Sequence, residues 1–273
     1  MIYMQRGADK TLIKNTVIEG AVRPSNDLYT ETNDGDLPKR FKYELPIGHV
    51  KGLPIPRDVM LNLTEDGIRA YPIKGSVTVE NCIVKKTRGG IKLYLAKGDV
   101  TVRNCTVLDC IIEGYSLPSG GKIINCSGNA AYGPLIYMHF DRTSNHQIDL
   151  TILPAPHAVG NHAFAAIRGS EHRINLTQAD SPIDSTLRPI VVGYKARFQF
   201  LTTDYPELPV GYEANFDKHY KNKRYTASNI SIKNGTEYPV ILGDLSEGNT
   251  ITSVGPVRDL GVNNRVSHME RAN

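Results

Sequence analysis

A histidine, an arginine and a tyrosine occupy one position of three successive strand-like segments, at His139, Arg168 and Tyr194. Apolar residues alternate with other residues along these segments, so the three side chains are predicted to point away from the core. If the segments stack as neighbouring strands, about 4.8 Å apart, the three side chains lie within about 10 Å of one another. Tyr137, two residues before His139, is predicted on the same face.

This set of side chains suits the β-elimination of a uronic acid. The reaction needs a cation that neutralises the C6 carboxylate, a base that removes the C5 proton and an acid that protonates the leaving oxygen. Arg168 can bind the carboxylate through two parallel hydrogen bonds. His139 is the candidate base, because histidine has an ordinary pKa of about 6.5. Tyr194 or Tyr137 can donate the proton, most readily if Arg168 lowers the pKa of the phenol.

Other residues are candidates for binding the rest of a sugar chain. Tyr115 is predicted one coil before Tyr137, and both belong to an outward column of equivalent positions. The predicted column reads Tyr71, Tyr94, Tyr115, Tyr137, Ala166, Val192 and Leu242. The charged candidates that lie close to the set in the sequence are Arg142, Arg188, Lys195 and Glu113.

Alternative interpretations of these residues stay open. The tyrosines could only stack on one another, which is worth about 0.5–1.5 kcal/mol per pair. Lys195 could act as the base with Arg168 as the acid. Two carboxylates, Asp141 with either Glu171 or Glu113, could hydrolyse a glycosidic bond. The surface could also bind a glycan without cleaving it, as a non-catalytic module.

A long internal repeat indicates which elements position these residues. Residues 67–82 read GIRAYPIKGSVTVENC and residues 90–105 read GIKLYLAKGDVTVRNC, with ten of sixteen aligned residues identical and an offset of 23 residues. Strand-like segments continue the pattern at 122–126, 147–150, 173–176 and 229–232, and a second set lies at 133–137, 189–192 and 239–242. Two or three short strands in each period of about 21–26 residues predict a solenoid of stacked coils.

The repeats end in asparagine, and amides at one turn position would hydrogen-bond along the stack at Asn81, Asn104, Asn125 and Asn175. Together, the repeats and these asparagines resemble the pectate-lyase-like family of right-handed parallel β-helices over about residues 10–262. The resemblance implies an all-β fold with one domain over residues 1–273. The family contains pectate and alginate lyases beside glycoside hydrolases and phage tail proteins, so the resemblance specifies the fold more than the function, and the acidic polysaccharide partner is predicted from the outward residues. No catalytic motif of the family is matched residue by residue.

Two segments break the rhythm of the repeat. Residues 22–66 contain five prolines, and residues 204–227 are rich in tyrosine, lysine and arginine. Long loops on a regular scaffold are often functional. Both segments are therefore predicted to form walls of a cleft, with capping of the solenoid as the alternative for the first.

The composition limits the class of partner. Hydrophobic residues make up 40% of the 273 residues and charged residues 22%, which fits a packed globular core. The net charge of +4 is compatible with a polyanionic sugar, and the lack of a long basic run predicts no nucleic-acid partner.

No apolar run is long enough to span a bilayer, so no membrane partner is predicted. The residues from Met1 do not read as a secretory signal, so a cytoplasmic location is one expectation, and a secreted or periplasmic one would require a leader outside this sequence. A monomer is expected.

The cysteines predict packing rather than a metal site. Cys82, Cys105 and Cys126 fall at equivalent repeat positions, which favours stacked buried thiols over a metal or disulfide. The sequence contains no zinc spacing, no glycine-rich phosphate loop and no clear aspartate cluster for the calcium that many β-helix lyases use. No cofactor or metal is therefore expected, with calcium left open.

Overall fold

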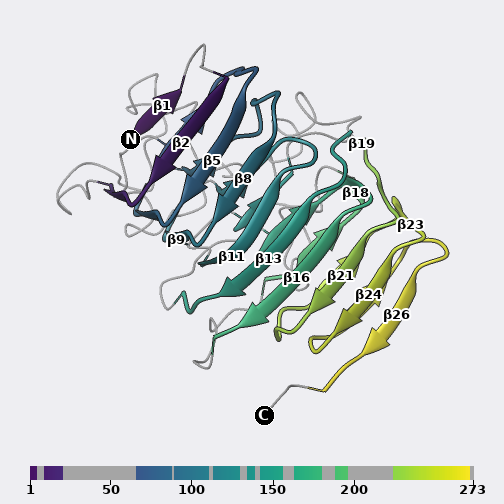
Figure 1. Ribbon diagram of the computed structural model, residues 1–273. Helices are drawn as coiled ribbons and strands as arrows, with labels where there is room; N and C mark the ends of the chain where they lie inside the picture. Colours follow the sequence, from purple (N-terminus) through teal and green to yellow (C-terminus); the bar gives the residue numbers. More distant parts are fainter. Residues whose placement is uncertain are drawn as a thin grey trace, which may run out of the picture.

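The structure, a computed structural model, describes residues 1–4, 9–20, 66–87, 89–110, 113–129, 134–138, 142–155, 163–179, 188–195 and 224–270. These residues form a parallel β-helix, in which strands far apart in the sequence lie side by side along the whole molecule (Figure 1). The described residues contain no helix. The all-β solenoid predicted from the repeat is therefore confirmed.

Sheet A forms one wall of the solenoid and has nine parallel strands among the described residues. In spatial order they are β1 (Ile2–Met4), β4 (Ile68–Ala70), β7 (Gly89–Lys92), β10 (Glu113–Ser116), β12 (Ile136–Tyr137), β14 (Ala165–Ile167), β17 (Ile190–Val192), β22 (Val240–Leu242) and β25 (Val257–Asp259).

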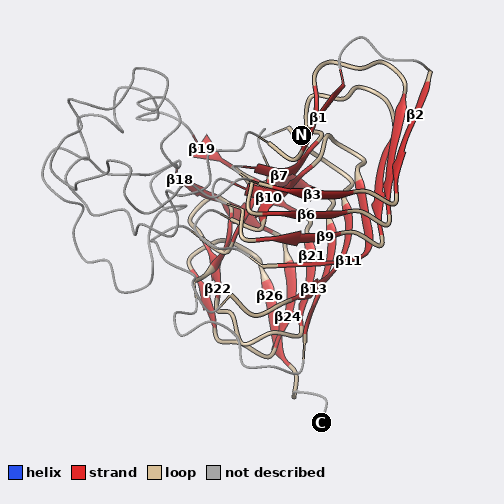
Figure 2. Ribbon diagram, turned by 90° about the vertical axis from the view of Figure 1, so that its left-hand side faces the viewer, coloured by secondary structure: helices blue, strands red, loops and turns tan. Residues whose placement is uncertain are grey.

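Sheet B forms the second wall, and its main path also has nine strands in the described ranges. In spatial order they are β2 (Lys10–Lys14), β5 (Ser76–Glu80), β8 (Val100–Arg103), β11 (Lys122–Gly128), β13 (Gln147–Ile152), β16 (Arg173–Gln178), β21 (Ser231–Asn234), β24 (Thr250–Ser253) and β26 (Arg265–His268). A branch of this sheet, stacked in Figure 2, consists of β3 (Val17–Glu19), β6 (Ile83–Lys85) and β9 (Thr106–Leu108).

Two smaller sheets complete the later coils. The first is parallel and contains β15 (Gly169–Ser170), β20 (Ala227–Ser228) and β23 (Ser246–Glu247). The second is an antiparallel pair of β18 (Tyr194–Lys195) and β19 (Arg224–Tyr225). This pair joins the chain just after β17 to the chain just before β20, at the two ends of residues 196–223.

The register of the early coils agrees with the repeat. Ile68 pairs with Ile91 in sheet A, and Val77 pairs with Val100 in sheet B, which is the predicted offset of 23 residues in both walls. A constant offset keeps each side chain on the same side of its sheet from coil to coil. The repeat therefore stacks identical residues directly on one another.

The core lies between the two walls, and alternation in sheet B builds its half. In β5, Val77 and Val79 are fully buried, whereas Ser76, Thr78 and Glu80 on the other face are partly exposed. Successive side chains of a strand point to opposite faces. Each buried valine contributes about 1.5–3 kcal/mol relative to an exposed one, so one apolar position repeated in every coil gives a continuous core.

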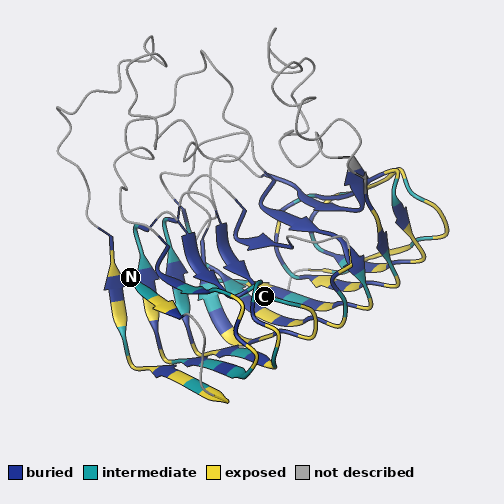
Figure 3. Cartoon of the chain, turned by 90° about the horizontal axis from the view of Figure 1, so that it is seen from above, coloured by how far each residue is buried: buried dark blue, intermediate teal, exposed yellow. Residues whose placement is uncertain are grey.

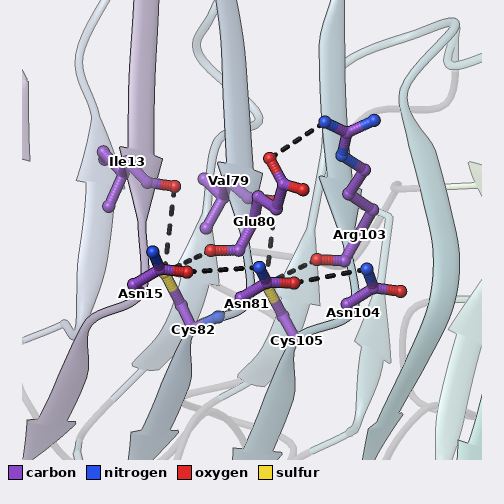
Figure 4. Close-up of polar contacts among 9 residues, drawn as sticks. All are labelled: Ile13, Asn15, Val79, Glu80, Asn81, Cys82, Arg103, Asn104 and Cys105. Carbon is purple, nitrogen blue, oxygen red and sulfur yellow. Dashed lines mark hydrogen bonds and ion pairs between the residues drawn. The ribbon is translucent and has the colours of Figure 1, made fainter.

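A ladder of asparagines runs along the turn that follows sheet B (Figure 4). Asn15, Asn81, Asn104 and Asn125 all have left-handed backbones, with φ between 49° and 53°, a conformation that asparagine tolerates better than most residues. Each Nδ2 donates to the Oδ1 of the asparagine one coil before, at 3.2, 3.2 and 2.9 Å. The predicted turn ladder is confirmed for three of its residues and extends to Asn15.

The prediction for Asn175 is wrong. This residue lies inside β16 and donates to Oδ1 of Asp149 at 2.9 Å rather than to a turn asparagine. The register of sheet B shifts between Ile123 and Cys126, and beyond that irregularity β13 and β16 run straight for six residues each. The coils of β13 and β16 therefore replace the asparagine turn by a longer strand.

The cysteines stack beneath this ladder. The backbone amide of Cys82 donates to Sγ of Cys105, and that of Cys105 donates to Sγ of Cys126, both at 3.4 Å. All four cysteines of the chain are described, and all four are buried free thiols. The preference for stacked thiols over a disulfide is confirmed.

The two excursions lie largely outside the described residues. Residues 21–65 and 196–223 are not described, so their prediction as cleft walls stays a prediction. None of the described segments forms a helix with the length and apolar character that crossing a bilayer needs.

Candidate active site

Sheet A differs from sheet B because its central strands are buried on both faces. Every described residue of β7, β10, β12, β14, β17 and β22 is buried, as the dark blue strands of Figure 3 show. One face contributes to the core. The other carries the polar and aromatic side chains that form the candidate site, which is therefore closed to solvent.

The register corrects the outward column. The equivalent outward positions are Arg69, Lys92, Ser116, Tyr137, Ala166, Val191 and Ile241. The predicted column agrees at Tyr137 and Ala166, but Val192 and Leu242 belong to the core. The extra residues between the repeats shift the coils by one or two positions, and a shift of one residue moves a side chain to the opposite face.

Tyr115 was predicted to face outward, and this prediction is wrong. Its partners in sheet A are Ile91 and Ile136, so it lies in the inward column. Its hydroxyl is 2.8 Å from the carbonyl oxygen of Ser127 and 3.0 Å from that of Cys105. Burial raises the pKa of this phenol well above its ordinary value. Tyr115 is a satisfied core residue.

Arg168 lies between β14 and β15 on the outer side of sheet A, and only 1% of it is exposed. Its Nε donates to the carbonyl of Met138. Its guanidinium carbon lies 3.9 Å from the ring centroid of Tyr225 and 5.3 Å from that of Tyr137. Among the described residues, Nη1 of Arg168 has no hydrogen-bond partner.

Tyr194 completes this group. Its ring packs against Tyr225, with centroids 5.2 Å apart, across the β18–β19 pair. We call Tyr137, Tyr194 and Tyr225, with the small apolar residues that pack against them, the tyrosine cluster. It is separate from the core, and its apolar members are Ala163, Ala166 and Val191.

The charge of Arg168 has no carboxylate partner in the described part of the chain. Burial lowers the pKa of Arg168, but the phenol oxygens of the three tyrosines raise it by more, so the guanidinium stays charged. A buried cation without a counter-ion is costly unless an anion or several hydrogen bonds compensate it. The cluster therefore holds a fixed positive charge with a free donor.

Tyr194 is a neutral phenol in this environment. Burial raises its pKa, and the opposing effect of Arg168 is smaller. The expectation that Arg168 lowers the phenol pKa is right for the contribution of Arg168 alone, but burial outweighs it. A phenol that stays protonated can serve as a proton donor and is a poor base.

A second group of charges lies at the start of the same outer face. Nζ of Lys92 is 2.6 Å from Oε1 of Glu113 and 3.3 Å from Oδ1 of Asp66, and all three side chains are at most 7% exposed. Nη1 of Arg69 is 2.8 Å from the other oxygen of Asp66. Burial lowers the pKa of Lys92, and the two carboxylates raise it by more. The charges of the two cations and the two carboxylates sum to zero. We call these four residues, Arg69, Asp66, Lys92 and Glu113, the ion-pair ladder.

Gly89 makes room for the ladder. A Cβ there would lie 2.5 Å from Oδ1 of Asp66 and 2.5 Å from Cδ of Lys92. Glu113, predicted to bind substrate, pairs with Gly89 in the sheet and is occupied by Lys92.

The remaining sequence candidates are not all in one place. Arg142 is exposed in the turn before β13, and Arg188 is buried just before β17. Lys195 pairs with Arg224 in the antiparallel ribbon, and its side chain is not described. His139 lies outside the described residues.

The structure thus brings three of the four predicted catalytic residues together, namely Arg168, Tyr137 and Tyr194. Tyr225, whose ring is nearest to Arg168, was missed. It lies near the end of the 204–227 excursion, so no repeat offset relates it to the other positions. The only signal in the sequence was the tyrosine content of that segment.

The described residues contain no group of three or more histidine, cysteine, aspartate or glutamate side chains placed to hold a metal ion. No protein-family model matches the chain, and no curated protein matches it.

Proposed function

We propose that this chain is a polysaccharide lyase that cleaves a uronate-containing polysaccharide by β-elimination at the tyrosine cluster. The observation that carries the proposal is the fully buried Arg168, whose charge lacks a carboxylate partner and whose Nη1 lacks a hydrogen bond among the described residues. The likeness of the repeats to pectate-lyase-like β-helices supports the same class of substrate.

A sugar carboxylate is the anion that fits this arginine best. Guanidinium groups bind carboxylates through parallel N–H donors, and such charge-assisted bonds are roughly twice as strong as neutral ones. The rings of Tyr225 and Tyr137 pack against the guanidinium, with centroids 3.9 and 5.3 Å from its carbon, and Nε is taken by the Met138 carbonyl, so Nη1 is the donor that an anion would meet. The same rings give a sugar an apolar surface to pack against.

In the proposed reaction, Arg168 neutralises the C6 carboxylate and makes the C5 proton more acidic. His139, two residues after Tyr137, takes that proton. The electron pair of the C5–H bond forms the C4–C5 double bond, and the bond between C4 and the leaving oxygen breaks. Tyr194 or Tyr137 gives its hydroxyl proton to that oxygen. Burial keeps Tyr194 protonated and so able to donate, and the opposing effect of Arg168 limits the rise in pKa that would make it a weaker acid.

The site must open before a polymer can reach it. Arg168 and Tyr194 are 1% and 0% exposed. Opening and closing of an active site over a substrate excludes water and often limits turnover. The proposal therefore includes a closed resting state.

The test is incubation with alginate, pectate, glucuronan and glycosaminoglycans. A lyase produces an unsaturated uronate, which is seen as new ultraviolet absorbance together with new reducing ends. New reducing ends without absorbance would make the chain a hydrolase. Binding without products would make it a glycan-binding module. Either outcome contradicts the proposed reaction.

Two matched variants test the site. Arg168→Gln keeps most of the volume and removes the charge, so turnover should fall by about 10²–10³-fold. Arg173→Gln removes an equally charged residue that is exposed on sheet B, and turnover should not change. Full activity of Arg168→Gln on a substrate that the parent cleaves would place the reaction elsewhere.

A further inference from the structure

Two buried histidines lie in the turns beside Arg168, one coil apart. His146 precedes β13 and His172 precedes β16, and both are at most 4% exposed. Their Nδ1 atoms are 3.2 Å apart, and their ring centroids are 4.8 Å apart. Neither ring belongs to the tyrosine cluster. One of them nevertheless contacts the backbone of Arg168.

The contacts of His172 determine which of its nitrogens carries the proton. The backbone N–H of His146 donates to Nδ1 of His172 at 3.2 Å, so this nitrogen is an acceptor. Nε2 of His172 lies 2.8 Å from the carbonyl oxygen of Arg168, which can only accept. His172 is therefore a neutral ring with its proton on Nε2.

His146 has an acceptor on each side. Its Nε2 lies 3.3 Å from the carbonyl oxygen of Leu117, and its Nδ1 faces the unprotonated Nδ1 of His172. A neutral imidazole has one N–H and can satisfy only one of these two contacts. The other contact then sets two lone pairs against each other. Only the imidazolium form of His146 donates to both neighbours, and its Nδ1–H then shares the single lone pair of His172 Nδ1 with the backbone N–H of His146.

We infer that His146 and His172 form a one-proton pair that positions Arg168. Proton uptake by His146 completes a hydrogen-bonded chain from the carbonyl of Leu117 through both rings to the carbonyl of Arg168. The same carbonyl accepts from Oγ1 of Thr143 at 3.2 Å. Gly169, which follows, has φ of +94°, and a Cβ there would collide with the Thr143 carbonyl. The carbonyl of Arg168 is thus hydrogen-bonded by His172, and the next residue has a backbone conformation and a close contact that only glycine fits.

The groups around the two histidines favour the uptake of one proton by the pair and disfavour the uptake of a second. Burial lowers the pKa of His146, and the carbonyls of Leu117 and Pro118 oppose this effect. Burial and the neighbouring His146 lower the pKa of His172 to about 4. Among the described residues, no carboxylate or other cation acts on either ring, and each faces the other ring and backbone carbonyls. The first proton therefore belongs to His146, and a second would set two cations 3.2 Å apart.

The first experiment follows the imidazole nitrogens by NMR on the isotope-labelled chain from neutral pH to about pH 4. Signals are assigned with His146→Gln and His172→Phe, and His268→Gln, at an exposed position, serves as the control. We expect His146 to become an imidazolium while His172 keeps its Nε2–H form. Protonation of both rings in one step, or of neither above pH 4, would overturn the inference.

The second experiment separates positioning from simple repulsion. In His172→Phe the acceptor of the His146 Nδ1–H is lost, so His146 should titrate about one to two pH units lower. If the rings only repel each other, the same variant raises the pKa of His146, which contradicts the inference. Should His172→Phe not fold, the titration of the parent decides alone.

The link to Arg168 has its own readout. The NMR signal of the Arg168 Nε–H should shift with the pH midpoint of His146, and this shift should be absent in His146→Gln. An Arg168 signal that does not follow His146 would refute the positioning role. This measurement needs no substrate, so it can fail or succeed independently of the proposed lyase reaction.

Discussion

Replacing Lys92 by methionine tests whether the buried ion-pair ladder stabilises the outer face of sheet A. The substitution keeps the length of the side chain and removes the ammonium that lies 2.6 Å from Glu113 and 3.3 Å from Asp66. Asp66 keeps its 2.8 Å contact with Arg69, whereas Glu113 loses its described cation. Breaking a buried pair by removing one partner costs about 3–5 kcal/mol, because the remaining buried carboxylate loses the cation closest to it.

The expected result is a lower free energy of unfolding that depends on pH. For a chain of this size, about 2 °C of melting temperature corresponds to 1 kcal/mol, so Lys92→Met should melt about 6–10 °C below the parent at neutral pH. At acidic pH the buried carboxylate of Glu113 becomes protonated in the variant. A neutral carboxyl group costs less free energy to bury than a carboxylate. The difference between variant and parent should therefore shrink toward acidic pH.

The assay is thermal unfolding followed by circular dichroism at several pH values. Lys97→Met, at an exposed position on the turn after β7, is the matched control and should melt within about 1 °C of the parent. A melting temperature of Lys92→Met equal to that of the parent at neutral pH would refute the reasoning. So would a deficit that does not change with pH.

Three further predictions concern the pH response, the core and the thiols. His172 has a pKa of about 4 in the folded chain against an ordinary value of 6.5, so the unfolded chain binds the proton first as the pH falls. The contribution of neutral His172 to the free energy of unfolding is fully present above pH 6.5 and is lost between about pH 6.5 and 4, by up to about 3 kcal/mol. Denaturant titrations at several pH values should therefore show that the free energy of unfolding falls less steeply with decreasing pH in His172→Gln than in the parent. Val79→Ala removes a fully buried side chain of β5 and should cost about 1–3 kcal/mol in the same titrations, whereas Thr78→Ala on the outer face should cost less. The four buried thiols should react with a thiol reagent only after the chain unfolds. Burial raises the pKa of Cys110 to about 12, so little thiolate is present to react at neutral pH. Fast labelling of Cys110 in the native chain would contradict its buried position.

The early coils could be predicted from the sequence because their repeats have one length. Alternation assigns Val77, Val79, Val100 and Val102 to the core without any knowledge of their partners. The same period predicts the stack of Cys82 on Cys105. A pattern of period two together with a constant offset is enough, since each coil sees a copy of itself.

The candidate site depended on the tertiary structure, for two physical reasons. Between unequal coils the register is set by hydrogen bonding and packing, and a change of one residue reverses the face of a side chain. This is why Tyr115 lies in the core although Tyr137, one coil later, lies outside. Tyr225 reaches Arg168 only because β19 pairs with β18 across an excursion, and no local pattern encodes that closure. Alternation specifies which residues share a face within one strand, whereas the pairing of coils decides which faces meet.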